Sequence, residues 1–486
     1  IPVKPETLYE NLNSVDERLL ERSETAKSPR RRPWWMGAVA AALVAVVAFG
    51  AAFWPKGSPL GVEAHAIETA AYPEMAPYPD EADYVDQATG EYDNEGFNQA
   101  HDAWWESKQA LLPEEGYADG LDSFFQESIP VFLGGKEGEN AAYSPVNVYM
   151  ALAMLAELTD GASRQQILDL LGSDSLEALR QQAQAVWRAQ YQNDGATTTI
   201  LASSVWLDED ISYNQETMQT LAESYYASSY QGQMGSEEYT QLLREWLNDQ
   251  TGGLLEEQAE GVEMKPEDVL ALATTLYYKA RWADEFSPEN TSPQTFHAPS
   301  GDVEVDFMHQ TMEESYYQGE NFGVVRKGLQ NSGAMWLILP DEGTTPEQLL
   351  EQGDALEPLL AEYNWEDWEP RTVHLSLPKF DAVSETDLLG GLEALGVTDV
   401  MDPAVSDFSP LTSEIEGLYL SSAQHAVRVT TDEEGVEAAA YTVFSLSATS
   451  AGEMPEELDF VLDRPFLFAI TSDDGLPLFV GVVNQP

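Results

Sequence analysis

The side chains in this sequence that could carry acid–base, nucleophilic or metal chemistry are its histidines, serines and acidic residues. The 486-residue chain has no cysteine, which excludes disulfides, thiolate metal sites and cysteine nucleophiles. It has no G-x-S-x-G motif, no H-E-x-x-H motif and no phosphate-binding glycine loop. The histidines lie apart without metal-ligand spacing, at His65, His101, His297, His309, His374 and His425. We therefore expect no enzyme activity, no catalytic residue, no metal and no cofactor.

The charge of the chain further limits its partners. The formal net charge is −62 at pH 7, and residues 1–33 hold seven of the 23 basic residues against six acids. Nucleic-acid binding needs a basic surface that displaces phosphate counterions, so we expect no nucleic-acid partner. A heparin-like polyanion is excluded for the same reason. The function must therefore come from shape or from binding to another kind of partner.

One apolar run, residues 34–54, has the length of a membrane span. It contains 21 residues without a charge, carries tryptophan at both ends, and as a helix would be roughly 31 Å long. An arginine triplet at 30–32 precedes it, which predicts that residues 1–33 are cytoplasmic and that the rest is extracellular. A cleaved signal peptide is the alternative, but the long polar leader argues against it. We expect a single-pass cell-membrane protein.

The remainder divides into a spacer and one large domain. Residues 55–118 contain 14 acids and six prolines, which predicts an extended, poorly packed stalk. Residues 119–486 mix helical and strand-like runs without βαβ alternation, which predicts one α+β domain with large mixed β-sheets. The helical runs are 121–135, 147–158 and 163–172, and the strand-like runs are 197–207, 267–282, 332–340, 371–380, 418–429, 459–471 and 477–486.

The stretch EEGVEAAAYT, Glu433–Thr442, combines a strand pattern with an exposed setting. After Gly435, one alternating set is small or apolar and begins with Val436, whereas the other begins with Glu437. The flanking TTDEEG and SATSAGEMPEE read as exposed loop. A strand pattern in a loop is a local–global conflict that is typical of a conformational switch. An ordinary edge strand with a long hairpin loop fits the pattern equally well.

This stretch resembles the hinge of the reactive loop in the serpin family, and several other motifs of the chain resemble serpin motifs and follow in the same order. The motifs are NAAYSPVNVYMALAMLAELTDGASRQQILDLLG with Asn140, Ser144 and Pro145, LREWLNDQTGGLL with Trp246, Thr251 and Gly252, LYYKARWADEF with Trp282, LSLPKF, LGVTDVMDPAVSDFS, LYLSSAQHAVRV and DRPFLFAITSDDGLPLFVGVVNQP. The resemblance covers about residues 119–486. It implies a serpin-like fold with an exposed reactive-centre loop, here preceded by one transmembrane helix.

The resemblance also implies a mechanism and a partner. A serpin inhibits serine proteases as a suicide substrate: the protease cleaves the loop, and the loop inserts into the main sheet while the acyl-linked protease is distorted. We expect a membrane-anchored, bacterial, monomeric serpin that forms a covalent acyl complex with its target. A non-inhibitory serpin-fold cell-surface binding protein is the alternative, and the small, uncharged hinge positions speak against it. The hinge residues are Glu433, Glu434, Gly435, Val436, Glu437, Ala438, Ala439, Ala440, Tyr441 and Thr442.

The resemblance places two structural sites beside the sheet. The breach tryptophan is Trp282, and His425 and Ser144 match the family's shutter. Thr274 stands where the family usually has asparagine, and Asn147 where it usually has serine. Because an amide and a hydroxyl have exchanged places, we predict that Asn147 hydrogen-bonds the imidazole region of His425.

Counting 17 residues from Glu433, as in most of the family, implies that the scissile bond joins Thr449 to Ser450, with Leu446, Ala448 and Met454 left open. No Lys or Arg lies between Arg428 and Arg464, so trypsin-like targets are disfavoured. A small residue at the bond favours elastase-like or subtilisin-like proteases, whose specificity pockets are shallow.

Overall fold

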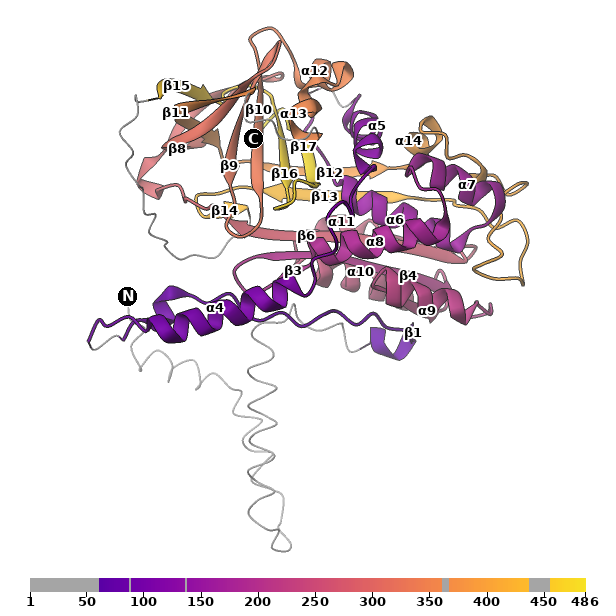
Figure 1. The fold of residues 1–486 in the computed structure, drawn as a ribbon. Coiled ribbons are helices and arrows are strands. Elements are labelled where there is room, and N and C mark those ends of the chain that lie inside the picture. Colours follow the sequence, from indigo (N-terminus) through magenta and orange to yellow (C-terminus); the bar gives the residue numbers. More distant parts are fainter. Residues whose placement is uncertain (1–60, 87–88, 136–137, 361–366, 437–454) are drawn as a thin grey trace, which may run out of the picture. The chain divides into compact units, whose positions relative to one another are not determined.

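The computed structural model describes residues 61–86, 89–135, 138–360, 367–436 and 455–486, all within one unit that spans Pro55–Pro486. It has two larger β-sheets; several of its helices pack on the six-stranded sheet, and α5 and α6 contact the β17–β2 end of the nine-stranded sheet (Figure 1). The helices are α4 (Asn94–Gln109), α5 (Leu121–Leu133), α6 (Pro145–Leu158), α7 (Gly161–Leu170), α8 (Leu176–Gln190), α9 (Gln215–Ser224), α10 (Glu237–Gln250), α11 (Glu256–Glu260), α12 (Pro346–Gln352), α13 (Glu357–Leu360) and α14 (Leu389–Ala394). The predicted helices in the first third of the domain are confirmed.

The six-stranded sheet, called the main sheet below, has the order β1-β5-β4-β6-β14, with β3 paired to β4. Its strands are β1 (Ala66–Glu68), β3 (Gln192–Asn193), β4 (Thr198–Asp208), β5 (Ala227–Gly232), β6 (Leu270–Arg281) and β14 (Gly435–Val436). The pair β12 (Asp381–Asp387) and β13 (Gln424–Thr430) is assigned as a separate two-stranded sheet and runs alongside β6 (Figure 1). The main sheet is therefore flanked by a second pair of strands beyond β6.

The nine-stranded sheet has the order β15-β11-β8-β9-β10-β16-β17-β2, with β7 paired to β8. Its strands are β2 (Ala141–Tyr143), β7 (Thr291–Ala298), β8 (Gly301–Gln318), β9 (Phe322–Gly328), β10 (Ala334–Pro340), β11 (Trp368–Pro378), β15 (Glu456–Val461), β16 (Phe466–Thr471) and β17 (Pro477–Val483). Most pairs are antiparallel, whereas β11 pairs with β15 in parallel. The predicted α+β domain with large mixed sheets is confirmed.

Helix α6 lies at the centre of this arrangement and contacts β6 and β17. Its N-terminus is set by sequence, because Ser144 caps the helix by accepting a hydrogen bond from the amide of Asn147, and Pro145 occupies the first turn. Nearly all of its side chains are buried, as expected for a helix that is apolar on every face. The cap Ser144 and Asn147 in the first turn are two of the predicted site residues.

The segment predicted as a loose stalk is folded against the domain. Its described part, residues 61–118, begins with Val62 fully buried and continues into β1, which pairs with β5 at the edge of the main sheet. The ring of Tyr72 lies 5.1 Å from that of Trp187 in α8, measured between ring centres. The expectation of poor packing is wrong for these residues, because Trp104 is buried and the half-buried Tyr72 packs against Trp187.

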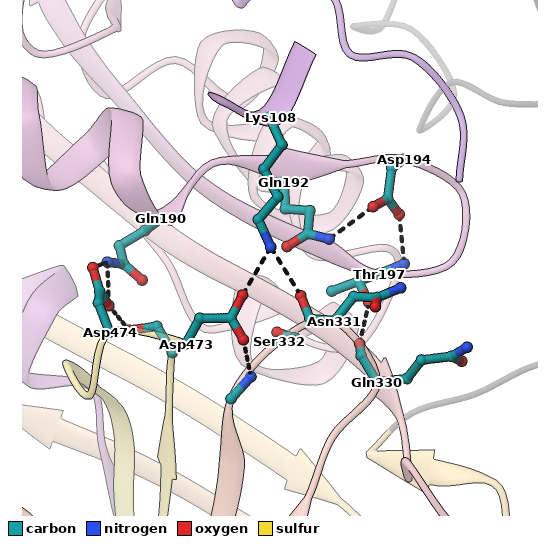
Figure 2. Close-up of polar contacts among 12 residues, drawn as sticks. Lys108, Gln190, Gln192, Asp194, Thr197, Gln330, Asn331, Ser332, Asp473 and Asp474 are labelled. Atoms are coloured by element: carbon teal, nitrogen blue, oxygen red, sulfur yellow. Dashed lines mark hydrogen bonds and ion pairs between the residues drawn. The ribbon is translucent and has the colours of Figure 1, made fainter. Parts of the chain in front are cut away.

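Polar contacts hold the C-terminal half of this segment in place (Figure 2). The indole of Trp104 donates a 2.8 Å hydrogen bond to the carboxylate of Asp194 in the β3–β4 turn. The ammonium of Lys108 forms a 2.8 Å ion pair with Asp473 and also donates to the carbonyl of Asn331 at 3.3 Å. We call residues 61–118 the N-terminal strap, because it joins the sheet edge to two turns of the nine-stranded sheet.

Candidate functional site

The described part of the predicted hinge already pairs with the main sheet. Gly435 and Val436 form β14 and lie antiparallel to Arg281 and Ala280 of β6. The segment after β6 holds the residues just before β14. The backbone amide of Trp282 donates to the carbonyl of Glu434 at 3.0 Å. The first residues of the hinge thus lie in sheet register beside the C-terminal end of β6.

Position 435 must be glycine because the backbones of β14 and β6 approach closely there. A Cβ atom at this position would lie 2.3 Å from the carbonyl oxygen of Ala280 and 2.7 Å from the Cα atom of Arg281. The turn before it is fixed by Asp432, whose carboxylate accepts from the amides of Glu434 at 2.9 Å and Gly435 at 3.1 Å. A short polar turn and a glycine therefore allow the chain to enter the sheet.

The carboxylate of Glu433 has two side-chain partners. Lys379 forms a 2.7 Å ion pair with it, and the hydroxyl of Thr291 donates a 2.8 Å hydrogen bond. Burial acts to raise the pKa of Glu433, but the bonds from Lys379 and Thr291 outweigh it, so the pKa lies below its ordinary value. Sequence reasoning missed both partners, because they lie 54 and 142 residues away in the chain and no local pattern signals them.

Trp282 is almost fully buried, at 2% exposure, and reaches the turn that precedes the hinge. Its indole N–H donates a 2.8 Å hydrogen bond to the carbonyl of Asp432. Its ring meets that of Phe286 edge-on, with 5.8 Å between ring centres. The amide of Phe286 in turn donates to the carbonyl of Glu433 at 3.0 Å. Trp282 and Phe286 therefore hold three consecutive residues, Asp432 to Glu434.

Beyond the hinge, the space between β6 and β13 contains two small cavities of about 20 Å³ each, room for roughly one water molecule. We call this space the strand slot. Its lining combines residues of β6, residues of β13 and the hinge: Leu276, Tyr277, Tyr278, Val427, Arg428 and Val436. The slot is therefore a seam between the main sheet and the β12–β13 pair, and Leu254 and Phe479 also line its cavities.

The shutter residues lie at the base of the slot. The backbone amide of Ser144 donates to Nε2 of His425 at 3.1 Å, and the hydroxyl of Ser144 donates to the carbonyl of Leu478 at 2.7 Å. The side-chain amide of Asn147 donates to the carbonyl of Thr274 at 3.4 Å. Helix α6 thus contacts β6 through Asn147 and β13 through Ser144.

The predicted partner of Asn147 was wrong. Its amide nitrogen contacts the β6 backbone rather than the imidazole, because Asn147 lies one turn into α6, whereas Ser144 at the helix start faces His425. Asn147 is 3% exposed and does not face solvent. Its carbonyl oxygen has no hydrogen-bond partner. The structure therefore places an unpaired acceptor beside the slot.

Several predicted residues lie outside the described ranges. The hinge positions Glu437, Ala438, Ala439, Ala440, Tyr441 and Thr442, the proposed bond between Thr449 and Ser450, and the predicted span at 34–54 belong to this group. Within the described ranges, no helix is long and apolar enough to cross a bilayer. The same part of the chain holds no group of three or more His, Asp or Glu side chains that could bind a metal ion.

Comparison with known proteins identifies the family. The family model described as "Serpin (serine protease inhibitor)" matches residues 131–486, and the chain belongs to this family. Among curated relatives, Serpin-Z2B of Triticum aestivum is 29% identical over 365 residues, which cover 71% of this chain and 90% of that protein. Serpins are generally protease inhibitors rather than enzymes. The predicted membrane anchor and bacterial source go beyond these comparisons and stay predictions.

The solved structures of one relative distinguish two conformations. The thermophilic serpin tengpin in its native state superimposes with a TM-score of 0.68 at 26% identity, covering 77% of this chain and 95% of that one. Its latent state gives a TM-score of 0.62 over 77% of this chain and 97% of that one. The present fold is thus more similar to the native form of that protein than to its latent form.

Proposed function

We propose that this chain inhibits serine proteases as a suicide substrate whose cleaved loop becomes a strand of the main sheet. The target's serine oxygen bonds the carbonyl carbon of Thr449, the C–N bond to Ser450 breaks, and the departing amine takes the proton. The severed loop then enters the slot beside β6 and carries the acyl-linked protease with it. Distortion of the protease stops hydrolysis of the acyl bond.

The observation that carries this proposal is the start of β14 at the mouth of the slot. Val436 pairs with Ala280, so the first rungs of the new strand exist before cleavage. Because antiparallel strands alternate, residues of β6 with the parity of Ala280 direct their peptide groups to the same side. The groups at Tyr278 and Leu276 are in position to pair with an entering strand, whereas the carbonyl of Thr274 already accepts from Asn147.

Small side chains favour entry of the loop. The loop positions that alternate with Val436 are Ala438, Ala440 and Thr442. Val436 is buried, at 4% exposure, which supports an inward orientation for this set. Small inward side chains keep the barrier to insertion low, and the native state then persists because uncleaved insertion is slow.

The proposed targets are elastase-like or subtilisin-like proteases. The loop has no basic residue for a trypsin-like specificity pocket, and the proposed bond follows a small threonine. We further propose that the inhibitor is monomeric and that a single membrane span at residues 34–54 holds the domain outside the cell. The apolar run and the arginine triplet before it support that location.

Incubation of the full chain with pancreatic elastase tests the function. We expect a covalent complex that survives boiling in detergent and whose mass equals the protease plus the inhibitor without its C-terminal fragment. The cleaved product should resist heat better than the intact protein. Clean cleavage without a complex would overturn the proposal and favour a non-inhibitory cell-surface binding protein.

A further inference from the structure

A buried cation lies directly behind the residues that hold the hinge. Lys327 in β9 is 3% exposed. Its ammonium donates to the carbonyl of Asp284 at 2.7 Å and to the side-chain carbonyl of Gln310. The ammonium also lies 4.3 Å from the ring centre of Phe286 and 5.3 Å from that of Trp282. A positive charge is thus enclosed by two carbonyl oxygens and two aromatic rings.

These two rings belong to the residues that bind the hinge. Trp282 and Phe286 donate the three hydrogen bonds to the carbonyls of Asp432, Glu433 and Glu434. Lys327 contacts both rings and bonds the backbone between them. Attraction of the cation to the rings therefore fixes the segment 282–286, and this segment fixes the hinge.

The surroundings make the charge sensitive to alkaline pH. Burial lowers the pKa of Lys327 to about 8, and the negative charges of Asp284 and Glu314 act against this shift. Burial also raises the pKa of Glu285, one residue from Asp284. The other charged groups facing this segment and the hinge are Arg281, Asp432, Glu434 and the ion pair of Lys379 with Glu433.

We propose that Lys327 is a positioning residue for loop insertion, whose buried ammonium holds the Trp282–Phe286 segment and, through it, the hinge at the mouth of the slot. The insertion step rests on the proposed inhibitory function, whereas the effect on the hinge can be measured without a protease. Charged Lys327 keeps the first rungs in register, so that the cleaved loop inserts before the acyl bond is hydrolysed. Neutral Lys327 weakens the hold and diverts more inhibitor into cleaved product.

The pH dependence of the free energy of unfolding distinguishes this positioning role of Lys327 from a role in packing alone. Because the native pKa lies below the ordinary value of 10.5, the unfolded chain binds this proton more tightly than the folded one. This group therefore destabilises the fold below pH 8, and its penalty disappears as pH rises from about 8 to 10.5. Above pH 8 we expect the hinge to be held less firmly, although the contribution of Lys327 to the free energy of unfolding becomes less unfavourable. A lysine with only a packing role would change hinge protection and the free energy of unfolding in the same direction.

The test compares Lys327→Gln, which removes the charge but keeps a donor, with the exposed control Lys265→Gln in the full chain. Hydrogen exchange at the amides of Trp282 and Phe286 is measured at pH 7 and pH 9 and corrected for intrinsic rates. We expect wild-type protection to fall about fivefold between these pH values. In Lys327→Gln, amide protection at pH 7 should already be as low as in the wild type at pH 9, and it should not change between these pH values. Lys265→Gln should behave like the wild type.

The fraction of inhibitor that forms a covalent complex with elastase, compared between variants at one pH, should follow the same order. Equal protection and an equal pH step in a folded Lys327→Gln variant would overturn the inference. If the wild type forms no complex, the proposed function fails and amide exchange still decides the role of Lys327. If Lys327→Gln does not fold, Lys327→Arg is the second variant, and it should keep amide protection at both pH values because arginine stays charged. A wild type whose amide protection does not fall between pH 7 and pH 9 would also overturn the inference.

Discussion

The β1 edge of the main sheet and its opposite border, where β6 faces β13, are built in different ways. At the edge, the strap adds β1 to β5, and further along the strap Trp104 joins Gln192, Ala196 and Thr197 as donors to Asp194 in the β3–β4 turn. At the opposite border, β6 and β13 are separated by the slot with its small cavities. Unpaired buried polar atoms occur beside both regions, at Gln190 and Asn331 near the strap and at Asn147 beside the slot, so the two regions differ in strand pairing and packing rather than in polar satisfaction.

In the proposed mechanism, this difference places the opening for the new strand between β6 and β13. A covered edge, by contrast, blocks pairing with other chains. A sheet that accepts a new strand must instead have a seam at which few interactions break when the strands separate. In the proposed mechanism, a seam between β6 and β13 admits the cleaved loop while the strap keeps the β1 edge paired.

The largest effect is expected from a charge on the inward side of the hinge. Ala440→Glu should abolish the covalent complex and turn the inhibitor into a substrate, because a carboxylate entering the slot would be buried without a partner. The matched control is Ala439→Glu on the alternate side, which should keep the complex. Gel analysis after reaction with elastase distinguishes the two, and equal behaviour of both variants would contradict the alternation.

A second change tests how the strap is anchored. Asp194→Ala leaves three buried donors, those of Trp104, Gln192 and Thr197, without this acceptor, together with the half-buried amide of Ala196, and should lower the free energy of unfolding by about 3 kcal/mol. The partition between complex and cleaved inhibitor should stay unchanged, because the slot is not altered. Denaturant unfolding of this variant and of the exposed control Asp102→Ala measures the loss. A strap that contributes nothing to stability would give the two variants the same midpoint.

The entrance to the slot is tested by Gly435→Ala. The added Cβ would meet the carbonyl of Ala280, so the hinge should separate from β6 and the fraction forming complex should fall about tenfold, the equivalent of ~1.4 kcal/mol. Gly390→Ala in α14 is the control, because a Cβ there has open space. Retention of full activity in Gly435→Ala would show that the preformed rungs are dispensable.

The smallest effect concerns the ion pair of Glu433 with Lys379. Because the native pKa of Glu433 is depressed, this pair stabilises the fold above the ordinary pKa of 4.5 and loses its effect as pH falls through the native pKa. Lys379→Met should therefore cost about 1 kcal/mol at pH 7 and progressively less in acid. Thermal melting at several pH values measures it, with Lys265→Met as control. A loss that persists unchanged at pH 3 would have another cause.

The sequence predicted the fold class and much of its detail. Period-two and helical spacings located β4, β6, β10, β17 and the helices α5 and α6, because these segments are long and strongly patterned. The resemblance to serpins predicted a hinge at Glu433–Thr442, of which the structure describes Glu433 to Val436, and Gly435 lies in close contact with the β6 backbone. These features could be predicted because each depends on residues that are close together in the chain.

The strap and the shutter could not be predicted in this way. Prolines and acids in residues 55–118 have the composition of a spacer, and the partners of Trp104 and Lys108 lie 90 and 365 residues further along. For Asn147, residue type indicated a hydrogen bond, but only the rotation of α6 decided which strand receives it. Composition indicates only the average tendency of a segment, whereas packing of the strap on the domain depends on a few side chains and on the positions of their partners.

The sequence by itself determined a long acidic chain, an apolar run, the local elements and a stretch of small residues after Gly435. Only the tertiary structure decided that the strap closes the sheet edge, that β6 faces β13 across a slot, and that Lys327 lies behind the hinge. The physical reason is that periodicity and capping act over a few residues. Burial and hydrogen bonding in the folded chain act between residues that only the completed packing brings together.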